Sequence, residues 1–229
     1  MPEFIRARRP YQKRERSEAI LATAAELLDH HPVGEITLTE IARRSGFSKS
    51  NLYRYFESRE DIFIQLFLAD LMNWVESLEK AMVPLYRCGD PWVVGKAAAD
   101  SLLDYPRVCE LTASLSTVLE QNVSLDIIRS FKHQVALVGI RVGNTLGAAL
   151  PEIPAEHFQV LFRLMEATLT GIWHSAHPPE VVREALEEPG LEVFRSDFGE
   201  DLGLAYGALL AGFLHPSGKK AASEDRGWN

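Results

Sequence analysis

Helical periodicity is the feature that most constrains what this chain can fold into. Apolar residues recur at intervals of three and four along most segments, whereas the strict alternation typical of strands is nearly absent. Glycine and proline fall mostly between the periodic segments, where helices end. The sequence therefore predicts an all-α protein with about nine to ten helices. We expect these helices at residues 12–31, 38–45, 49–55, 59–82, 91–103, 107–121, 125–149, 155–176, 179–187 and 197–214.

Composition narrows the class of protein further. Of 229 residues, 46% are hydrophobic and 24% are charged, as in an ordinary globular chain. Residues 1–16 lack the apolar core of a signal peptide, and the longest strongly apolar run, residues 202–214, is too short to span a bilayer. Two cysteines, Cys88 and Cys109, are too few for a disulfide scaffold and fit a reducing compartment. We therefore expect a cytoplasmic protein without membrane contact, whose two thiols are structural.

Charge is distributed unevenly along the chain. Residues 1–60 hold eleven Lys and Arg against nine Asp and Glu, a net charge of +2, whereas the remaining residues carry a net charge of −10. A mildly basic head on an acidic body suggests that the two parts have different functions. The alternative interpretation is that the basic residues belong to a solvated N-terminal tail.

Residues 37–56 have the pattern of a helix-turn-helix. Thr37 and Glu40 form a capping box at the start of one short helix, Gly46 ends that helix, and Ser48 caps the next. In such a unit the second helix enters the DNA major groove, and a preceding helix closes the core. A plain helical hairpin is the alternative. We expect Phe47, Leu52 and Phe56 to face inward, and Lys49, Ser50, Asn51, Tyr53, Arg54 and Tyr55 to lie on or near the outer face.

This segment resembles the DNA-binding head of TetR-type transcriptional regulators. The resemblance is carried by Ile-Ala at 41–42, Gly-Phe-Ser at 46–48, Leu-Tyr-Arg-Tyr-Phe at 52–56 and Ser-Arg-Glu at 58–60. It covers residues 12–65, and the rest of the chain resembles the family only in being helical and of suitable length. Where the family usually has lysine this chain has Arg59, which keeps the charge but changes the donor geometry.

The resemblance implies a homodimer that reads a near-palindromic operator in double-stranded DNA, usually as a repressor released by a small molecule. A regulator without a small-molecule ligand, an activator, and an all-α enzyme or small-molecule carrier stay open as alternatives. Thr37 and Arg59 match phosphate-contact positions of the family. The full set of expected DNA-binding residues is Thr37, Ser48, Lys49, Ser50, Asn51, Tyr53, Arg54, Tyr55 and Arg59.

Four parts are expected along the chain on this basis. They are a basic N-terminal arm at 1–11, a helix-turn-helix DNA-binding domain at 12–60, a ligand-binding and dimerisation domain at 61–216, and a flexible tail at 217–229. The arm is expected to be flexible, and either to follow the DNA or to be simply solvated. The basic residues expected to follow the DNA at this end of the chain are Arg8, Arg9, Lys13 and Arg14.

The last expected helix carries small residues at every fourth position. Glycine inside a helix costs about 0.5–1 kcal/mol relative to alanine, so such a stripe must be offset by close packing of another helix. We expect the partner to be the helix at 155–176, and two such pairs would form the four-helix dimer interface that the resemblance implies. Packing of the last helix against its own chain is the alternative. The expected interface contains Phe158, Leu161, Met165, Leu169, Gly199, Gly203, Gly207, Ala208 and Ala211.

An effector cavity is expected between the fourth helix and the helices that follow it. Its lining should suit an apolar or aromatic small molecule. Aromatic side chains dominate protein cores in any case, so plain core packing is the alternative for each candidate. The candidates are Trp74, Tyr86, Trp92, Tyr105, Phe131, Phe162, Met165 and Trp173, with Asn122, His133, Arg141 and His174 as polar contacts.

Motifs of catalysis and cofactor binding are absent from the sequence. It contains no G-x-S-x-G, H-E-x-x-H, P-loop or G-x-G-x-x-G pattern. The pairs His30 with His31 and His174 with His177 fall at helix C-termini, where histidine also favours the helix dipole. We therefore expect no catalytic residues, no cofactor and no metal site.

Overall fold

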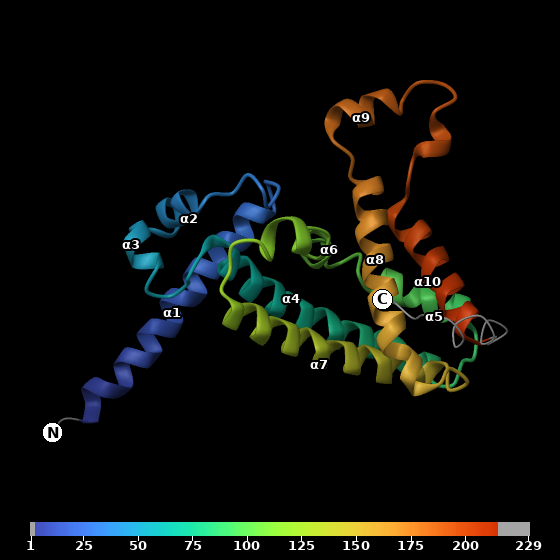
Figure 1. The fold of residues 1–229 in the computed structure, drawn as a ribbon, viewed down its shortest axis with the longest axis horizontal. Coiled ribbons are helices and arrows are strands. Elements are labelled where there is room, and N and C mark those ends of the chain that lie inside the picture. The colour runs from blue at the N-terminus through green and yellow to red at the C-terminus, as the bar shows by residue number, and fades with distance from the viewer. Residues whose placement is uncertain (1–2, 215–229) are drawn as a thin grey trace, which may run out of the picture. The chain divides into compact units, whose positions relative to one another are not determined.

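The structure, a computed structural model, describes the backbone of residues 3–214 and the side chains from residue 11 onward. Within that range the chain forms helices and no strand, which confirms the all-α fold (Figure 1). A membrane-spanning segment needs a long apolar helix, and none of the helices in the described residues meets that requirement. The α-helices of residues 3–214 are α1 Glu3–Leu28, α2 Leu38–Ser45, α3 Lys49–Leu52, α4 Arg59–Met82, α5 Pro91–Asp100, α6 Pro106–Ala113, α7 Leu125–Ala149, α8 Phe158–Ala176, α9 Glu180–Ala185 and α10 Phe198–Leu214.

Most helices begin and end within a few residues of the expected positions, and three differ. Helix α1 already begins at Glu3, so residues 3–11, expected as a flexible arm, are its first part. Helix α3 ends at Leu52 rather than residue 55. Helix α6 ends at Ala113 and is followed by a π-helical turn, Leu115–Leu119. The side chains of Arg8 and Arg9 and the tail at 217–229 lie outside the described residues.

The chain divides into two compact units. The first unit consists of Met1–Asn73 with Pro106–Ala136, and the second of Trp74–Tyr105 with Leu137–Asn229. Helices α4 and α7 each contribute residues to both units.

The core of the first unit joins α1, α2 and α3. Ile20 of α1, Ile41 of α2 and Leu52 of α3 are fully buried, as the periodicity predicts. The rings of Phe67 in α4 and Phe131 in α7 lie 5.9 Å apart between centroids. The short helices α2 and α3 are thus anchored to the core of the first unit through Ile41 and Leu52.

Arg107 at the start of α6 ties three helices of the first unit together. Its Nε and Nη2 donate to the two carboxylate oxygens of Asp70 in α4, at 2.9 and 3.2 Å. Its Nη1 donates to Asp29, which directly follows α1, at 3.1 Å. The carboxylates raise the pKa of Arg107, the hydrogen bonds to Asp70 contributing most. This guanidinium therefore fixes the C-terminal end of α1 to α4 and α6.

Close backbone packing between α5 and α10 defines the second unit. A Cβ added to Gly95 of α5 would lie 2.4 Å from the backbone nitrogen of Gly207 in α10. A Cβ on Gly207 would lie 2.6 Å from the ring of Trp92, and one on Gly203 would lie 3.1 Å from Lys96. The glycine stripe of α10 therefore packs against α5 of its own chain.

The glycines of this stripe therefore pack on α5 rather than on α8, the expected partner, whereas the dimer interface itself stays a prediction. Gly203 and Gly207 are buried, and Gly199 packs against Leu103. Of the expected α10 residues, Ala208 is exposed and Ala211 is partly exposed. Small-residue spacing shows that some helix approaches closely, but it does not say which one.

The expected interface residues of α8 also face the chain's own core. Phe158, Leu161, Met165 and Leu169 are all buried within the second unit. The hydroxyl of Tyr206 in α10 donates to the backbone carbonyl of Met165 at 3.3 Å. Helix α8 has apolar residues on two faces, so its periodicity alone does not show which face is buried. In the structure, the face that carries Phe158, Leu161, Met165 and Leu169 is the buried one.

Candidate nucleic-acid interface

The turn between α2 and α3 is built by local capping. Thr37 accepts a hydrogen bond from the backbone N–H of Glu40 at 3.2 Å, and Ser48 accepts one from Asn51 at 3.3 Å. Gly46 follows α2 with φ +75°, a left-handed conformation that glycine adopts without a steric penalty. Thr37, Gly46 and Ser48 thus have the capping roles that the sequence predicts.

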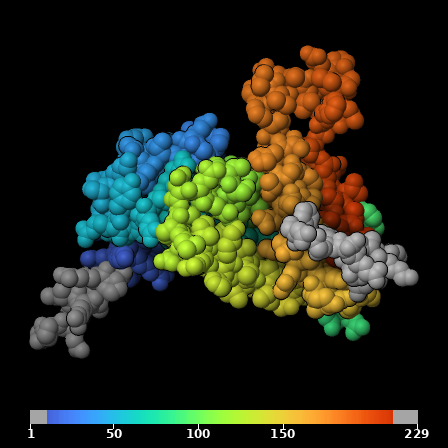
Figure 2. All heavy atoms as spheres, viewed as in Figure 1, coloured from blue at the N-terminus to red at the C-terminus, as the bar shows by residue number. Residues whose placement is uncertain are grey.

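Helix α3 presents a polar face to the outside of the first unit. Leu52 and Phe56 are buried and anchor the segment, whereas Tyr53 keeps 54% of its surface exposed. In the space-filling view of Figure 2, the atoms of α2 and α3, in light blue and cyan, are visible on the outside of the protein. The other residues of this face are exposed Lys49, Ser50 and Arg54, and half-buried Asn51 and Tyr55.

These side chains have the chemistry that base and phosphate contacts need. An asparagine amide can bond adenine at two atoms, and a lysine can bond guanine or a phosphate. The Tyr53 ring can contact a thymine methyl group. Exposed Lys49, half-buried Asn51 and, directly after the helix, exposed Tyr53 therefore form a face that is suited to the major groove.

Arg59 has a different position from the one expected. Its Nη1 donates to the backbone carbonyl of Ile36 at 2.8 Å, and its Nη2 and Nε donate to Glu60 at 2.8 and 3.1 Å. The side chain is only 21% exposed. Arg59 thus fastens the first turn of α4 to the loop before α2, and its expected phosphate contact stays a prediction. Thr37, the other expected phosphate contact, lies exposed at the surface.

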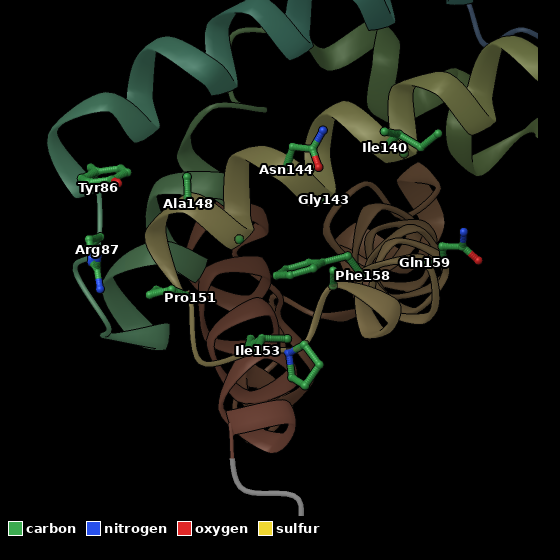
Figure 3. A pocket seen from close by; sticks show the side chains of 14 residues that line it. Tyr86, Arg87, Ile140, Gly143, Asn144, Ala148, Pro151, Ile153, Phe158 and Gln159 are labelled. Atoms are coloured by element: carbon green, nitrogen blue, oxygen red, sulfur yellow. The ribbon is translucent and has the colours of Figure 1, made fainter.

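A second site is a groove of about 680 Å³ within the second unit (Figure 3). It is lined by the segment after α4, by the last three turns of α7, by the loop to α8 and by the start of α8. Gly143 and Gly147 let Phe158 approach α7, since a Cβ on them would lie 2.9 and 3.1 Å from that side chain. Its lining includes Tyr86, Arg87, Asn144, Phe158 and Gln159.

Backbone hydrogen bonds fix the edge of this groove. The N–H groups of Arg87 and Gly89 donate to the carbonyls of Ala148 and Ala149 at 2.8 and 3.0 Å, which satisfies the last turn of α7. Arg87 adopts a left-handed φ of +54°, an uncommon value for a residue with a side chain. Its backbone is therefore held in a strained conformation beside the groove.

Of the expected effector residues, Tyr86 alone lines this groove, whereas Phe131 lines a hollow between α4 and α7 in the first unit. The others have separate positions, because aromatic periodicity reveals a core but not a hollow in it. Trp74 donates to Ser101, Trp92 lies over Gly207, and Phe131 packs with Phe67. Arg141 forms an ion pair with Glu79, whose pKa it lowers. The remaining candidates are buried Met165 and Trp173, half-buried Tyr105 and Phe162, and exposed Asn122, His133 and His174.

Some of the groove residues that the sequence analysis missed lie in a recognisable sequence pattern. Gly139, Gly143 and Gly147 recur every four residues in α7, the same spacing that drew attention to α10. Arg87 and Gln159 carried no signal, because a single polar residue near a helix end is common.

The histidines and cysteines show no metal cluster in the described residues. Across residues 11–214, no group of three or more His, Cys, Asp or Glu side chains is placed to hold a metal ion. His177 stacks on Trp173, with ring centroids 3.8 Å apart. Cys88 is exposed, whereas Cys109 is fully buried, and burial raises the pKa of its thiol to about 12.

Two family models match adjoining parts of the chain. The model described as "Bacterial regulatory proteins, tetR family" matches residues 20–66, and "Tetracyclin repressor-like, C-terminal domain" matches residues 68–217. The chain is 36% identical over 66 residues to the HTH-type transcriptional regulator EthR of Mycobacterium tuberculosis H37Rv, which is 29% of this chain and 30% of EthR. It is 29% identical over 69 residues to the fatty acid metabolism regulator protein of Bacillus subtilis 168, 30% of this chain and 36% of that protein. The match thus spans about a third of each curated relative's length.

Solved structures share the fold over nearly the whole chain. The fatty acid degradation regulator FadR of Bacillus halodurans superposes with a TM-score of 0.53 at 14% identity, over 87% of this chain and 97% of FadR. A transcriptional regulator of Rhodococcus sp. RHA1 gives 0.52 at 19% identity, over 86% and 96%. The C-terminal family model alone covers more than half of the sequence. With its capped helix-turn-helix and all-helical body, the chain belongs to the TetR family of DNA-binding transcriptional regulators.

Proposed function

We propose that this protein is a homodimeric transcriptional repressor that leaves a near-palindromic operator when a small molecule binds. The observation that carries the proposal is the outer face of α3. Lys49, Asn51 and Tyr53 project from a segment that is anchored by the buried Leu52 and Phe56. Such a face supplies base contacts without disturbing the core beneath it.

The proposed dimer uses the outer faces of α8 and α10. Leu164 of α8 is 40% exposed and Leu204 of α10 is 65% exposed, although both helices have buried inner faces. Gly171 and Gly212 have open space beside them, which leaves room for a close helix from a second copy. Two copies meeting here would form a four-helix interface and cover this apolar surface. The proposed interface therefore lies on a different face of α10 from the glycines that pack on α5.

The proposed effector site is the groove beside Tyr86 and Phe158. The two rings supply apolar contact area, and the Asn144 and Gln159 amides and the Arg87 guanidinium supply polar contacts at its edges. This lining favours an apolar or aromatic molecule that carries one polar or anionic group. No carboxylate lies among its lining residues.

Release from DNA is proposed to be a shift between two populations of the dimer. A ligand shifts such an equilibrium only by its difference in affinity for the two states. Helices α4 and α7 contribute residues to both units, so a change in their tilt would alter the separation of the two α3 helices in the dimer. Recognition helices about 34–36 Å apart match successive turns of one DNA face.

Selection of genomic DNA fragments by the purified protein at roughly physiological salt tests the proposal. The expected result is enrichment of one or a few palindromic sites, with half-sites one helical turn apart. A promoter carrying such a site should be silenced by the protein in a reporter assay and restored by the effector. A folded protein that enriches no fragment, with or without small-molecule extracts, would refute the DNA-binding role.

A further inference from the structure

A hollow of about 520 Å³ lies between the first halves of α4 and α7 (Figure 1). Its ten described lining residues all belong to the first unit, and none of them lines the groove proposed for the effector. Small-molecule sites in proteins have volumes of about 300–1,000 Å³. This α4–α7 hollow is therefore large enough for a ligand of its own.

Most of the surface inside the α4–α7 hollow is apolar. Ile64 of α4 and Phe131 of α7 are buried in the core, and the Phe131 ring packs against Phe67. Met72 lines the same hollow but keeps 41% of its surface exposed. A methionine side chain is flexible and adapts to the shape of what it contacts. An apolar molecule in the hollow would cover this exposed surface.

Neutral polar groups complete the lining. Gln65, Ser130 and Gln134 are exposed and supply amide and hydroxyl groups that can donate and accept hydrogen bonds. Among the described residues that line the hollow, Asp61 is the only charged one. Its carboxylate disfavours an anion, and it is only 5% exposed, with both oxygens already accepting bonds from the chain. The lining therefore favours an uncharged molecule with an apolar body and a hydrogen-bonding group.

Asp61 connects the hollow with the segment that follows α3. Its Oδ2 accepts a hydrogen bond from the backbone N–H of Glu57 at 2.9 Å, and its Oδ1 accepts one from Nε2 of Gln65 at 2.8 Å. Glu57 directly follows Phe56, one of the buried residues that anchor α3. A ligand that drew the Gln65 amide toward itself would remove one of the two bonds and change how Asp61 holds Glu57. The hollow can thus act on the recognition helix within the first unit.

We propose that the α4–α7 hollow is a second ligand site, which takes an uncharged apolar molecule and lowers operator affinity through Gln65 and Asp61. The site is separate from the effector groove, which contains Arg87 and favours an anionic group. Only the effect on the operator rests on the proposed DNA-binding function. Binding of the molecule itself is measurable without DNA.

Two small molecules that share one ring system test the chemistry of the site. N-phenyl-1-naphthylamine is uncharged and has one N–H donor, and 8-anilinonaphthalene-1-sulfonate is the same molecule with an added sulfonate. Equilibrium dialysis counts how many equivalents of each are bound per chain. The wild type should bind the uncharged compound in the hollow, where the sulfonate is disfavoured by Asp61.

Filling the hollow should remove this binding. Ala69→Trp introduces a large ring from α4 at an exposed lining position, and Ser130→Trp does so from α7. Each variant should lose one equivalent of the uncharged compound per chain and bind the sulfonate as the wild type does. Ala136→Trp, at an exposed α7 residue of the first unit outside the hollow, is the matched control and should bind both compounds normally. Circular dichroism confirms that each variant keeps its helices.

The effect on DNA is measured with the uncharged compound at saturation. It should lower the operator affinity of the wild type by about 5-fold or more, as expected for coupling between two sites. Gln65→Leu keeps an apolar wall and removes the amide that bonds Asp61. This variant should still bind the compound, and its operator affinity should change by a smaller factor than that of the wild type.

Each alternative outcome contradicts a different part of the proposal. Equal binding of the uncharged compound by the wild type and both filled variants would overturn the site. Binding in the hollow with unchanged operator affinity would overturn its action on the recognition helix. A wild-type protein that binds the compound in the hollow but enriches no DNA fragment would refute the DNA-binding function and leave the ligand site in place.

Discussion

Tyr53 is the residue on which base reading should depend most directly. Its ring is more than half exposed and adds little to the core, so Tyr53→Ala should change stability by no more than about 0.5 kcal/mol. Operator affinity should fall by about 1–3 kcal/mol, which is roughly 5- to 150-fold. Phe194→Ala removes another exposed aromatic ring, in the second unit, and serves as the control in the same gel-shift titration. Normal operator binding by Tyr53→Ala would show that the recognition surface lies elsewhere.

The two cysteines should differ in reactivity. Near neutral pH a thiol reagent should modify exposed Cys88 and spare buried Cys109 until the protein unfolds. Burial raises the pKa of Cys109 from 9.0 to about 12, because the thiolate would lose its hydration. Between these values the unfolded thiol loses its proton and the folded one keeps it, so stability should fall as pH rises, by at most about 1.4 kcal/mol per unit. Urea unfolding of wild type and Cys109→Ala should show a steeper loss above pH 9.0 in the wild type.

At the residue scale, the sequence predicted the features that depend only on neighbouring residues in the chain. The caps at Thr37 and Ser48 could be predicted because a side chain and the backbone three residues on form them without help from the rest of the fold. The position of Arg59 could not, because its partners include the carbonyl of Ile36, which tertiary folding brings near. The resemblance suggested a phosphate contact for a residue of which three of the five N–H donors already bond atoms of the protein.

At the scale of the element, the close contact of α5 with α10 leaves no room for a Cβ at Gly95. Gly95→Ala would place its Cβ 2.4 Å from a backbone atom of Gly207, and backbone cannot move aside as a side chain can. We expect a loss of about 1–3 kcal/mol in the free energy of unfolding. Gly34→Ala, with nothing within 4 Å of its Cβ, is the matched control and should be neutral or slightly stabilising. Equal stability of both variants in urea would show that the two helices are further apart.

Arg107 gives a second prediction for the elements of the first unit. Asp70 is 14% exposed and accepts two hydrogen bonds from Arg107, so Asp70→Asn should cost about 1–2 kcal/mol. Asp29 is 50% exposed and accepts one, so Asp29→Asn should cost less than about 1 kcal/mol. Chemical denaturation measures the free energy of unfolding of both variants. A larger loss in Asp29→Asn than in Asp70→Asn would contradict the prediction that the bond to Asp70 contributes more.

Helix identity could be read from the sequence far better than helix partners. Periodicity, proline and glycine mark where α4, α7 and α10 begin or end, because those signals are local. The partner of the α10 stripe depends on Gly95, a single glycine in α5 that no local pattern connects with α10. The groove escaped prediction for the same reason, since it arises where α7 glycines admit Phe158.

For the whole molecule, the exposed apolar residues on the outer faces of α8 and α10 predict a homodimer. The double substitution Leu164→Asp with Leu204→Asp places charges on both exposed faces, and burying them in a dimer would be costly. Light scattering should show a monomer with native helix content, and operator affinity should fall because two half-sites are no longer bound together. Val193→Asp, at a residue 80% exposed outside these helices, should stay dimeric. A wild-type monomer, in solution and on DNA, would refute the proposed interface.

The short α3 helix has a consequence for how such a regulator changes over generations. Only Leu52 of its four residues is buried, so the exposed Lys49 and Ser50 contribute little to the stability of the fold. Mutations at these positions escape the selection that protects a core, and a duplicated gene is free to acquire a new target site while it keeps its architecture. Substitutions on α3 could thus change which promoters such a regulator binds while its fold is preserved.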